Sequence, residues 1–423
     1  MLARGPDLSF GREDAPVDVP DPADLFERVR SLPAAKPLLA RLEERAGVHL
    51  AGGAVRDLLL GGVPSDLDLV VDGDAFAFAA SLGGKLKVHD RFGTSTVVLG
   101  EFAFDIARSR REAYARPGAL PDVEPAGLDE DLRRRDFTVN AMAIALDGER
   151  RGELNAVPGA LEDLDSRRLR VLHDASFIDD PTRLFRLARY AARLGFEIDP
   201  HTQALAVGAV EGGAVGTVSG SRLGAEVRLL ARERDPVRAL IGLRELGLDH
   251  ALHPGFGLDD EALARRGLAL LPPDARPDRL ALALASRGVP GPELPALLDW
   301  LAFEAGDRDA IAAAVARAEE LARALTATET PSEIAAAAAG APVELVALAG
   351  ALGPARQAHE WLDRLRHVHL SIDGRDLLAA GVPEGPAIGR GLRAALAAKL
   401  DGRARDREQE LAEALRAAGS APQ

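Results

Sequence analysis

Two aspartates, Asp66 and Asp68, stand one residue apart in the segment LLGGVPSDLDLVV (residues 59–71), which otherwise resembles a buried strand. Residues two apart on a strand point to the same face, so both carboxylates are expected to project together. A carboxylate that faces a core is costly unless it is paired, hydrogen-bonded or bound to a metal. Oxygen ligands with no histidine or cysteine beside them favour Mg²⁺ over zinc. We interpret Asp66 and Asp68 as candidate catalytic residues and Mg²⁺ ligands; the alternative is an exposed Asp-x-Asp strand edge.

A phosphate-binding turn is predicted upstream of this pair. Gly52 and Gly53 lack side chains, so their backbone amides could approach a phosphate at the start of the following helix. Arg56 lies one turn into that helix. A phosphate cradle followed by an acidic pair is what two-metal phosphoryl transfer requires. An ordinary glycine turn is the structural alternative, and the distance to the acidic pair favours the functional one.

Asp105, in the segment FAFDIARS, is a further carboxylate at the end of a predicted hairpin strand. It could be a third carboxylate at the site or the cap of a turn. The alternation of apolar and polar residues does not decide between these roles.

The segment DEDLRRRDFTVNAMAI (residues 129–144) combines three arginines with an aspartate and an asparagine. If it is helical, Asp136 and Asn140 share a face. Arg135 could then hold a triphosphate while Asp136 or Asn140 contacts ribose hydroxyls. The alternative is a solvated charge run that ends in a helix cap.

The segment DDPTRLFRLARY (residues 179–190) predicts a helix that begins near Pro181 and is capped by Asp180. Its arginines recur every three residues and form one stripe, whereas the residues between them are apolar and predicted to be buried. A carboxylate and a guanidinium together can read a base edge. The candidate base-reading residues are Asp180, Arg183, Arg186 and Arg189.

These residues lie on elements that predict an α+β fold. Strands and helices alternate over about the first 150 residues, with a hairpin across TSTVVLGEFAFDIARS and a mobile, proline- and glycine-rich loop at ARPGALPDVEPAG. Beyond Ala156 the strand signals fade, and leucine- and alanine-rich segments predict an all-helical remainder. We therefore expect a small mixed α/β head followed by an array of helices suited to docking a large partner.

Composition narrows the class of protein. The chain has 423 residues and no cysteine, which excludes cysteine-ligated metals. Its formal charge of −14 argues against a sequence-blind nucleic-acid coat but leaves room for a local basic groove. No run is apolar enough to span a bilayer, and the N-terminal segment has no apolar core, which predicts a polar, disordered leader and a cytoplasmic location. The histidines His89 and His173 are interpreted as surface residues. The sequence leaves the oligomeric state open.

Three segments in order, LAGGAVRDLLLGGVPSDLDLVV, DLRRRDFTVNAMAI and DDPTRLFRLARYAARLGF, resemble the class II tRNA nucleotidyltransferases and the related bacterial poly(A) polymerases. The resemblance is specific over residues 48–200 and returns at LSIDGRDLLAAGVPEGPAIGRGL. It implies a head, neck, body and tail that add C or A to tRNA 3′ ends from CTP or ATP without a template. The implied division is a leader at 1–24, a catalytic head at 25–155, a neck at 156–255, and a tRNA-docking body and tail at 256–423.

The resemblance also implies a role for each candidate. Asp66 and Asp68 would hold Mg²⁺, and Asp180 and Arg183 would read the base with support from Arg186 and Arg189. The triphosphate and ribose would be bound by Gly53, Arg56, Arg135, Asp136 and Asn140.

The chain departs from the family pattern at two places. Asp179 replaces the usual glutamate, and Ala156-Val157 replaces the usual Asp-Pro, which could loosen the hinge between head and neck.

The resemblance does not settle which nucleotides are added. The segment between the hairpin and the arginine run is close to full length, which favours addition of A or CCA over CC alone. The non-basic C-terminus favours tRNA over poly(A) synthesis. The expected function is a Mg²⁺-dependent tRNA nucleotidyltransferase adding A, with CC left open. Its alternatives are a poly(A) polymerase and a non-catalytic module that binds RNA or nucleotides.

Overall fold

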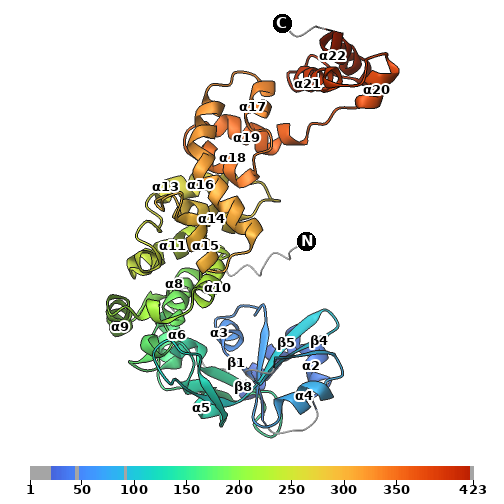
Figure 1. Ribbon diagram of the computed structural model, residues 1–423. Coiled ribbons are helices and arrows are strands. Elements are labelled where there is room, and N and C mark those ends of the chain that lie inside the picture. The colour runs from blue at the N-terminus through green and yellow to red at the C-terminus, as the bar shows by residue number, and fades with distance from the viewer. Residues whose placement is uncertain (1–20, 43–46, 90–92, 420–423) are drawn as a thin grey trace. The chain divides into compact units, whose positions relative to one another are not determined.

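The computed structural model describes residues 21–42, 47–89 and 93–419. The chain forms two compact units, which are treated separately (Figure 1). The first ends at Ser219 and includes Leu246–Ala251, and the second comprises Gly220–Glu245 together with the chain from Leu252. Within the described ranges no helix is long and apolar enough to cross a membrane.

A seven-stranded sheet forms the centre of the first unit. Its strands, in spatial order, are β3 (Lys85–His89), β4 (Thr94–Leu99), β5 (Phe102–Arg108), β2 (Leu67–Val71), β1 (Val48–Ala51), β8 (Met142–Ala145) and β9 (Leu154–Ala156). Strands β2 and β5 run parallel, and the other neighbours are antiparallel.

The two faces of this sheet differ. One face carries buried apolar side chains, among them Leu69, Val97 and Phe104, and helix α4 (Ala75–Ser81) packs on β4 and β5. The opposite face carries Asp68 and Asp105, whose side chains are exposed. The strand alternation therefore points both carboxylates away from the apolar core.

The remaining elements of the first unit are short helices and two small ladders. Its helices are α1 (Pro22–Ser31), α2 (Ala35–Leu39), α3 (Gly53–Leu59), α4, α5 (Leu128–Arg133), α6 (Ala160–Asp165), α7 (Ser176–Asp179), α8 (Thr182–Leu194), α9 (Pro200–Glu211) and the 3₁₀ turns η2 (Thr138–Asn140) and η3 (Ala214–Thr217). Strand β6 (Arg110–Ala113) pairs with β7 (Asp122–Pro125), and β10 (Arg168–Leu169) pairs with β11 (Glu197–Ile198). Helix α12 (Leu248–Leu252) crosses the boundary between the units.

The second unit is helical throughout its described residues. Its helices are α10 (Gly220–Ala231), α11 (Pro236–Glu245), α13 (Glu261–Ala269), α14 (Pro277–Ala285), α15 (Leu294–Trp300), α16 (Ala305–Thr326), α17 (Pro331–Ala337), α18 (Val343–Ala351), α19 (Ala355–Asp363), η4 (Leu365–His367), α20 (Gly374–Ala379), α21 (Pro386–Leu400) and α22 (Arg407–Gly419). Helix α18 is buried from Glu344 to Ala351 and packs against α13, α14, α16 and α19. Helices α20 to α22 enclose a separate small core around Leu377 and Ala395.

The predicted α+β class, with a mixed head and a helical remainder, is confirmed. Two expectations need correction. The disordered leader was predicted to extend to residue 24, but helix α1 begins at Pro22 and is capped by Asp21. Residues 1–20 lie outside the described residues. The proline- and glycine-rich segment expected to be a mobile loop contains strand β7, which pairs along its length with β6. The four-part division of the chain stays a prediction.

Candidate functional site

A polar cavity of about 340 Å³ lies in the first unit. It is lined by Gly52, Gly53, Asp68, Arg110, Glu112, Tyr114, Pro121, Arg134, Arg135, Asp136, Asn140, Asp180, Arg183, Arg186 and Tyr190. Most of the residues predicted from the sequence line this cavity, whereas Arg56, Asp66 and Arg189 lie outside its lining. Five guanidinium groups border it, which makes it suited to an anion such as a nucleoside triphosphate.

The glycine turn that lines the cavity lies between β1 and α3. Gly52 has a φ of +75°, a conformation that favours glycine, and its amide donates to the carbonyl of Met142. A Cβ at Gly52 would lie 2.7 Å from Nη1 of Arg135, so any side chain here would displace that guanidinium. The predicted strand, turn and helix are confirmed in the fold.

Arg135 reaches the same turn from the segment after α5. Its Nη2 donates to Oδ2 of the buried Asp131 at 3.0 Å. Its Nε is buried, and none of the residues that the structure describes accepts a hydrogen bond from it. A buried donor without an acceptor is costly, so a ligand oxygen arriving here would gain a charge-assisted hydrogen bond.

Asp136 and Asn140 meet, although the helix expected between them is absent. Helix α5 ends at Arg133, Phe137 is extended, and η2 supplies the turn that brings the two side chains together. Nδ2 of Asn140 donates to Oδ1 of Asp136 at 3.0 Å, and Nη1 of Arg56 donates to Oδ1 of Asn140 at 2.6 Å. Arg56 is therefore buried behind the cavity and orients Asn140.

Helix α8 supplies the arginine stripe. Arg183 is buried and donates to Oγ of Ser176 and to the carbonyl of Arg134, both at 2.7 Å. Arg186 pairs with Asp136 at 2.6 Å. Burial of Asp136 opposes its ionisation, but Arg186, Asn140 and Arg183 outweigh this effect and lower its pKa.

The last two predicted base-reading residues, Asp180 and Arg189, have different surroundings from Arg183 and Arg186. Asp180 accepts hydrogen bonds from the amide and hydroxyl of Thr182, at 3.2 Å and 2.7 Å, and so holds the first turn of α8 while it lines the cavity. Arg189 is buried against the ring of Tyr190, 4.8 Å from its centroid, and does not line the cavity. The predicted stripe therefore divides: Arg183 and Arg186 face the cavity and Arg189 packs behind it.

The carboxylates lie on the open face of the sheet. Asp68 and Asp105 are register partners on β2 and β5, and Asp105 lies within its strand, so the turn-cap alternative is wrong. Asp66 precedes β2, is exposed, and accepts a hydrogen bond from its neighbour Ser65. Withdrawal of solvent raises the pKa of Asp68, the Asp105 carboxylate raises it further, Arg135 opposes both, and Asp66 adds a smaller upward effect.

The carboxylate pair fits a divalent cation. A carboxylate whose pKa is raised by a neighbouring carboxylate, as that of Asp68 is by Asp105, is stabilised when a cation neutralises the charge, and Mg²⁺ is commonly held by one or two carboxylates together with substrate phosphates. No cluster of three or more acidic, histidine or cysteine side chains arranged for a metal occurs in the described part of the chain. A cation here would therefore take its remaining ligands from the substrate and from water.

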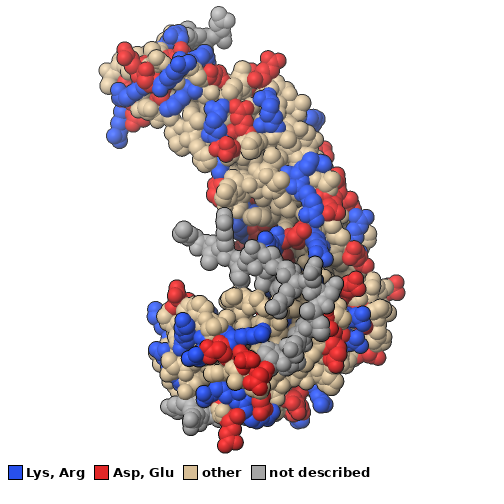
Figure 2. Space-filling model, turned by 180° about the vertical axis from the view of Figure 1, so that it is seen from behind, with Lys and Arg blue, Asp and Glu red and all other residues tan. Residues whose placement is uncertain are grey.

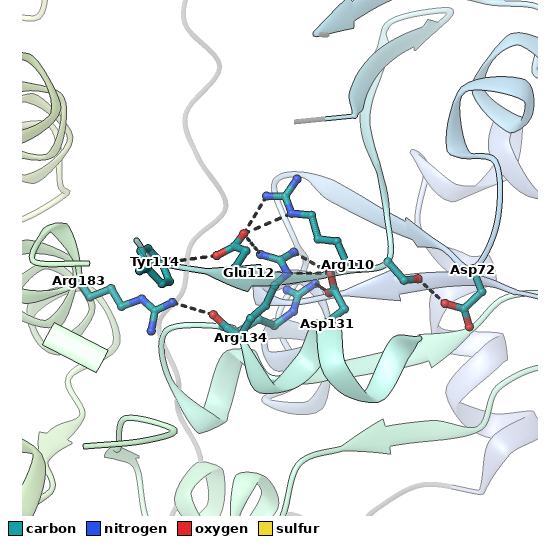
Figure 3. Close-up of polar contacts among 9 residues, drawn as sticks. Asp72, Arg110, Glu112, Tyr114, Asp131, Arg134 and Arg183 are labelled. Carbon is teal, nitrogen blue, oxygen red and sulfur yellow. Dashed lines mark hydrogen bonds and ion pairs between the residues drawn. The ribbon is translucent and has the colours of Figure 1, made fainter. Parts of the chain in front are cut away.

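The sequence interpretation missed the network on strand β6 (Figure 3). Glu112 accepts hydrogen bonds from Arg110 at 3.1 Å, from Arg134 at 2.8 Å and from the hydroxyl of Tyr114 at 3.0 Å. Arg134 also donates to the fully buried Asp131 at 2.7 Å. Burial raises the pKa of Tyr114 to about 12, so its hydroxyl stays a donor at neutral pH.

The network extends to Arg183, one of the candidate base-reading residues. The carbonyl of Arg134, whose side chain binds Glu112, is the acceptor for Arg183. Arg110, Glu112 and Tyr114 are spaced two residues apart, and this alternation is the signal that could have identified them as one face of a strand. Tyr190, also missed, contacts Phe137 edge to face and lies 5.7 Å from the Arg56 guanidinium.

A mixed α/β head that combines a glycine turn, a carboxylate pair and an arginine-rich cavity is typical of a nucleotidyltransferase. Residues 48–170 match the family model described as the poly A polymerase head domain. The chain is 36% identical over 387 residues to the CC-adding tRNA nucleotidyltransferase of Deinococcus radiodurans, covering 89% of this chain and 92% of that protein. It therefore belongs to the class II tRNA nucleotidyltransferase family, and the suspected resemblance is confirmed.

Other relatives match in part or in structure. The chain is 40% identical over 271 residues to the A-adding tRNA nucleotidyltransferase of Geobacter sulfurreducens, covering 61% of this chain and 30% of that protein. The chain spans only 27% to 50% of the length of three A-adding relatives, those of Geobacter sulfurreducens, Halalkalibacterium halodurans and Aquifex aeolicus. The fold is similar to the Thermotoga maritima CCA-adding enzyme complexed with tRNA, with a TM-score of 0.75 and 28% identity over 94% of this chain and 98% of that one. Nucleotidyltransferases of this kind generally use divalent metals.

Proposed function

We propose that the protein is a template-independent tRNA 3′-terminal nucleotidyltransferase that transfers AMP from ATP. The observation that carries the proposal is the arginine-rich cavity bordered by Asp68, with Asp105 in register beside it. A cavity for a triphosphate next to a carboxylate pair is what the attack of a hydroxyl on an α-phosphate requires.

Each group has a role in this proposal. Arg135 and the amides of Gly52 and Gly53 bind the triphosphate, and Asn140 and Asp136 orient the ribose. Arg183 and Asp180 read the base edge, and Arg186 holds Asp136 in place. Arg56 and Arg189 act from behind the cavity, through Asn140 and Tyr190 respectively.

Asp68 and Asp105 would hold Mg²⁺, and Asp66, just before β2, is a further candidate ligand. When bound, the ion lowers the pKa of the attacking hydroxyl and neutralises charge on the leaving pyrophosphate. In the reaction the RNA 3′-oxygen forms a bond to the α-phosphorus, the bond from that phosphorus to the bridging oxygen of the β-phosphate breaks, pyrophosphate leaves, and the hydroxyl proton passes to water.

The RNA partner has to be bound by local contacts. On the face drawn in Figure 2, basic and acidic side chains are interspersed, and the chain carries a net charge of −14. The second unit offers helical surface for docking tRNA, and we assign this role to the proposed body and tail at 256–423, which follow a proposed neck at 156–255. The cytoplasmic location stays a prediction.

The test uses three acceptors: tRNA lacking its terminal A, tRNA lacking CA and tRNA lacking CCA, each with ATP, with CTP and with both. We expect AMP incorporation on the acceptor that ends in CC, in the presence of Mg²⁺. The Asp66→Ala and Asp68→Ala variants should each lose transfer, and the exposed Asp24→Asn variant should retain it. No incorporation on any acceptor, or undiminished transfer by either alanine variant, contradicts the proposal.

Addition of CC is the second candidate, because the Deinococcus radiodurans relative, which the chain covers over 92% of its length, is CC-adding. CMP incorporation on the acceptor lacking CCA, without AMP on the acceptor ending in CC, would favour it. Repeated AMP addition to an unrelated RNA would favour a poly(A) polymerase. ATP binding without turnover on any RNA would favour a binding module.

A further inference from the structure

A row of polar side chains crosses four strands of the sheet and ends at the carboxylate pair. Lys87 on β3 is the register partner of Thr96 on β4, Thr96 is the partner of Asp105, and Asp105 is the partner of Asp68. Register partners on neighbouring strands point to the same face. The row therefore lies on the face that carries the proposed metal ligands.

The side chains in this row contact one another. Oγ1 of Thr96 donates to Oδ1 of Asp105 at 2.7 Å, and Nε2 of His89 lies 3.2 Å from the same hydroxyl. Lys87, His89 and Asp105 are exposed, and Thr96 is half-buried. The row is thus accessible from solvent along its length.

The cavity and the row meet at Asp68. Asp68 lines the cavity, whereas Asp105, Thr96 and Lys87 do not. On the other side of β2, strands β1 and β8 are buried along their whole length. If a nucleotide occupies the cavity, an RNA 3′-hydroxyl can reach Asp68 over the exposed surface of β5, β4 and β3.

The charge of the outer strand suits a nucleic-acid backbone. Lys85 and Lys87 are spaced two apart on β3, so both ammonium groups lie on the face of the row. Among the described residues no carboxylate pairs with either lysine. An unpaired ammonium is a suitable partner for a phosphate, and RNA bound across the row would bring one phosphate per nucleotide.

We infer that this row, together with Lys85 and His89 beside it on β3, binds the last nucleotides of the RNA acceptor. Lys85 and Lys87 contact backbone phosphates, and Thr96 fixes the Asp105 carboxylate that the terminal hydroxyl meets. The inference rests on the proposed function and adds to it the path by which the acceptor enters. The structural alternative is that the lysines only protect an edge strand from pairing with another chain.

The test compares Lys87→Ala and the double variant Lys85→Ala/Lys87→Ala with wild type. Lys36→Ala, which changes an exposed lysine on α2, is the control. Steady-state assays give KM for tRNA lacking its terminal A and KM for ATP. Fluorescence anisotropy with the same labelled tRNA gives Kd over a range of salt concentrations, and circular dichroism checks folding.

We expect the double variant to raise KM for tRNA about threefold to tenfold with KM for ATP unchanged. The slope of log Kd against log salt should fall by about 0.7 for each single-strand phosphate that the variant no longer binds. Lys36→Ala should match wild type in every measurement. These results would support the acceptor path.

Two outcomes overturn the inference while the proposed function stands. Wild type transfers AMP, but the double variant has the KM for tRNA and the salt slope of wild type; the lysines then only protect the edge. Alternatively, KM for ATP rises as much as KM for tRNA, which would make the row part of nucleotide binding. If wild type transfers no nucleotide to any acceptor, the proposed function fails, and an unchanged salt slope in the anisotropy measurement would then overturn the acceptor path as well.

Discussion

Asp68 both lines the cavity and forms a carboxylate pair with Asp105. Its pKa is raised by withdrawal of solvent and by Asp105. A protonated carboxylate does not bind a cation, so a raised pKa extends competition by protons to higher pH. We expect the Mg²⁺ concentration for half-maximal transfer to rise as pH falls toward the raised pKa of Asp68. The Asp105→Asn variant removes the second carboxylate. Its maximal rate of transfer should fall, and its half-activating Mg²⁺ concentration should begin to rise only at a lower pH than in wild type. Titrations with Mg²⁺ at each pH would measure both, and a half-activating concentration independent of pH would contradict this assignment.

Thr96 is expected to position Asp105 through its hydroxyl. Thr96→Val keeps the shape of the side chain and removes the donor, so the carboxylate is free to rotate. We expect kcat to fall about tenfold, as for the loss of one positioning hydrogen bond, with KM for ATP unchanged. Thr96→Ser should restore kcat because the hydroxyl returns. Equal losses in the valine and serine variants would indicate that packing, and not the hydrogen bond, matters at this position.

The sequence predicted the residues of the site better than the contacts among them. Asp68, Arg135, Asp136, Asn140 and Arg183 do gather, because each belongs to a segment with a strong local pattern. Their partners could not be predicted, since Arg56 meets Asn140 across 84 residues of chain and the carbonyl of Arg134 holds Arg183 across 49. Such contacts depend on how the elements pack, which no local pattern specifies.

At the scale of elements, strand β6 brings Arg110 and Glu112 to the cavity, Tyr114 follows directly after the strand, and Glu112 accepts hydrogen bonds from both of the others. Glu112 is 8% exposed and binds two guanidinium groups. We expect Glu112→Gln to destabilise the protein by about 1–3 kcal/mol, because Arg110 and Arg134 would share a half-buried site without their carboxylate. It should also raise KM for ATP, since the Arg134 backbone supports Arg183.

Glu124→Gln on the paired strand is the matched control for this change. Its partner Arg111 is 60% exposed and Glu124 is 63% exposed, so loss of that pair should cost less than about 1 kcal/mol. Urea unfolding measures both variants. Equal stabilities for the two would show that the Glu112 network does not hold β6 in place.

The β6–β7 ladder also shows where element prediction from sequence fails. The segment ARPGALPDVEPAG is rich in proline and glycine, residues that weaken strands, and therefore suggests a loop. Yet β7 is short and pairs on one side only, in a two-stranded ladder where proline can be accommodated. The long-range packing of this segment, with Gly118 against Thr217, overrides the local signal.

Helix α10 in the second unit is placed by two glycines, Gly220 and Gly224, that pack against the end of α15. A Cβ at Gly224 would lie 1.8 Å from the carbonyl oxygen of Leu301, so Gly224→Ala has to push α10 away from that end. We expect a loss of stability of about 1–3 kcal/mol. Gly208→Ala on α9 meets no atom within 4 Å and should stabilise its helix by about 0.5–1 kcal/mol. Thermal unfolding of both variants checks the opposite signs, and a neutral Gly224→Ala would contradict the close packing.

At the scale of the whole molecule, the chain consists of two compact units, and the candidate site lies within the first. Because the chain divides into two compact units, we expect two transitions in differential scanning calorimetry. A ligand stabilises only the unit that binds it, so ATP with Mg²⁺ should raise one transition. Gly224→Ala should lower the other.

This pair of shifts tests whether nucleotide binding and helical packing are energetically separate. The expected stabilisation is about 2.7 kcal/mol when ATP is present at about one hundred times its Kd, which is large enough to separate overlapping transitions. GTP at the same concentration is the control, because Arg183 and Asp180 are proposed to select the base. A single transition that responds to both ATP and Gly224→Ala would mean that the units unfold together, and that the chain crossing between them at residues 219, 245 and 251 couples them.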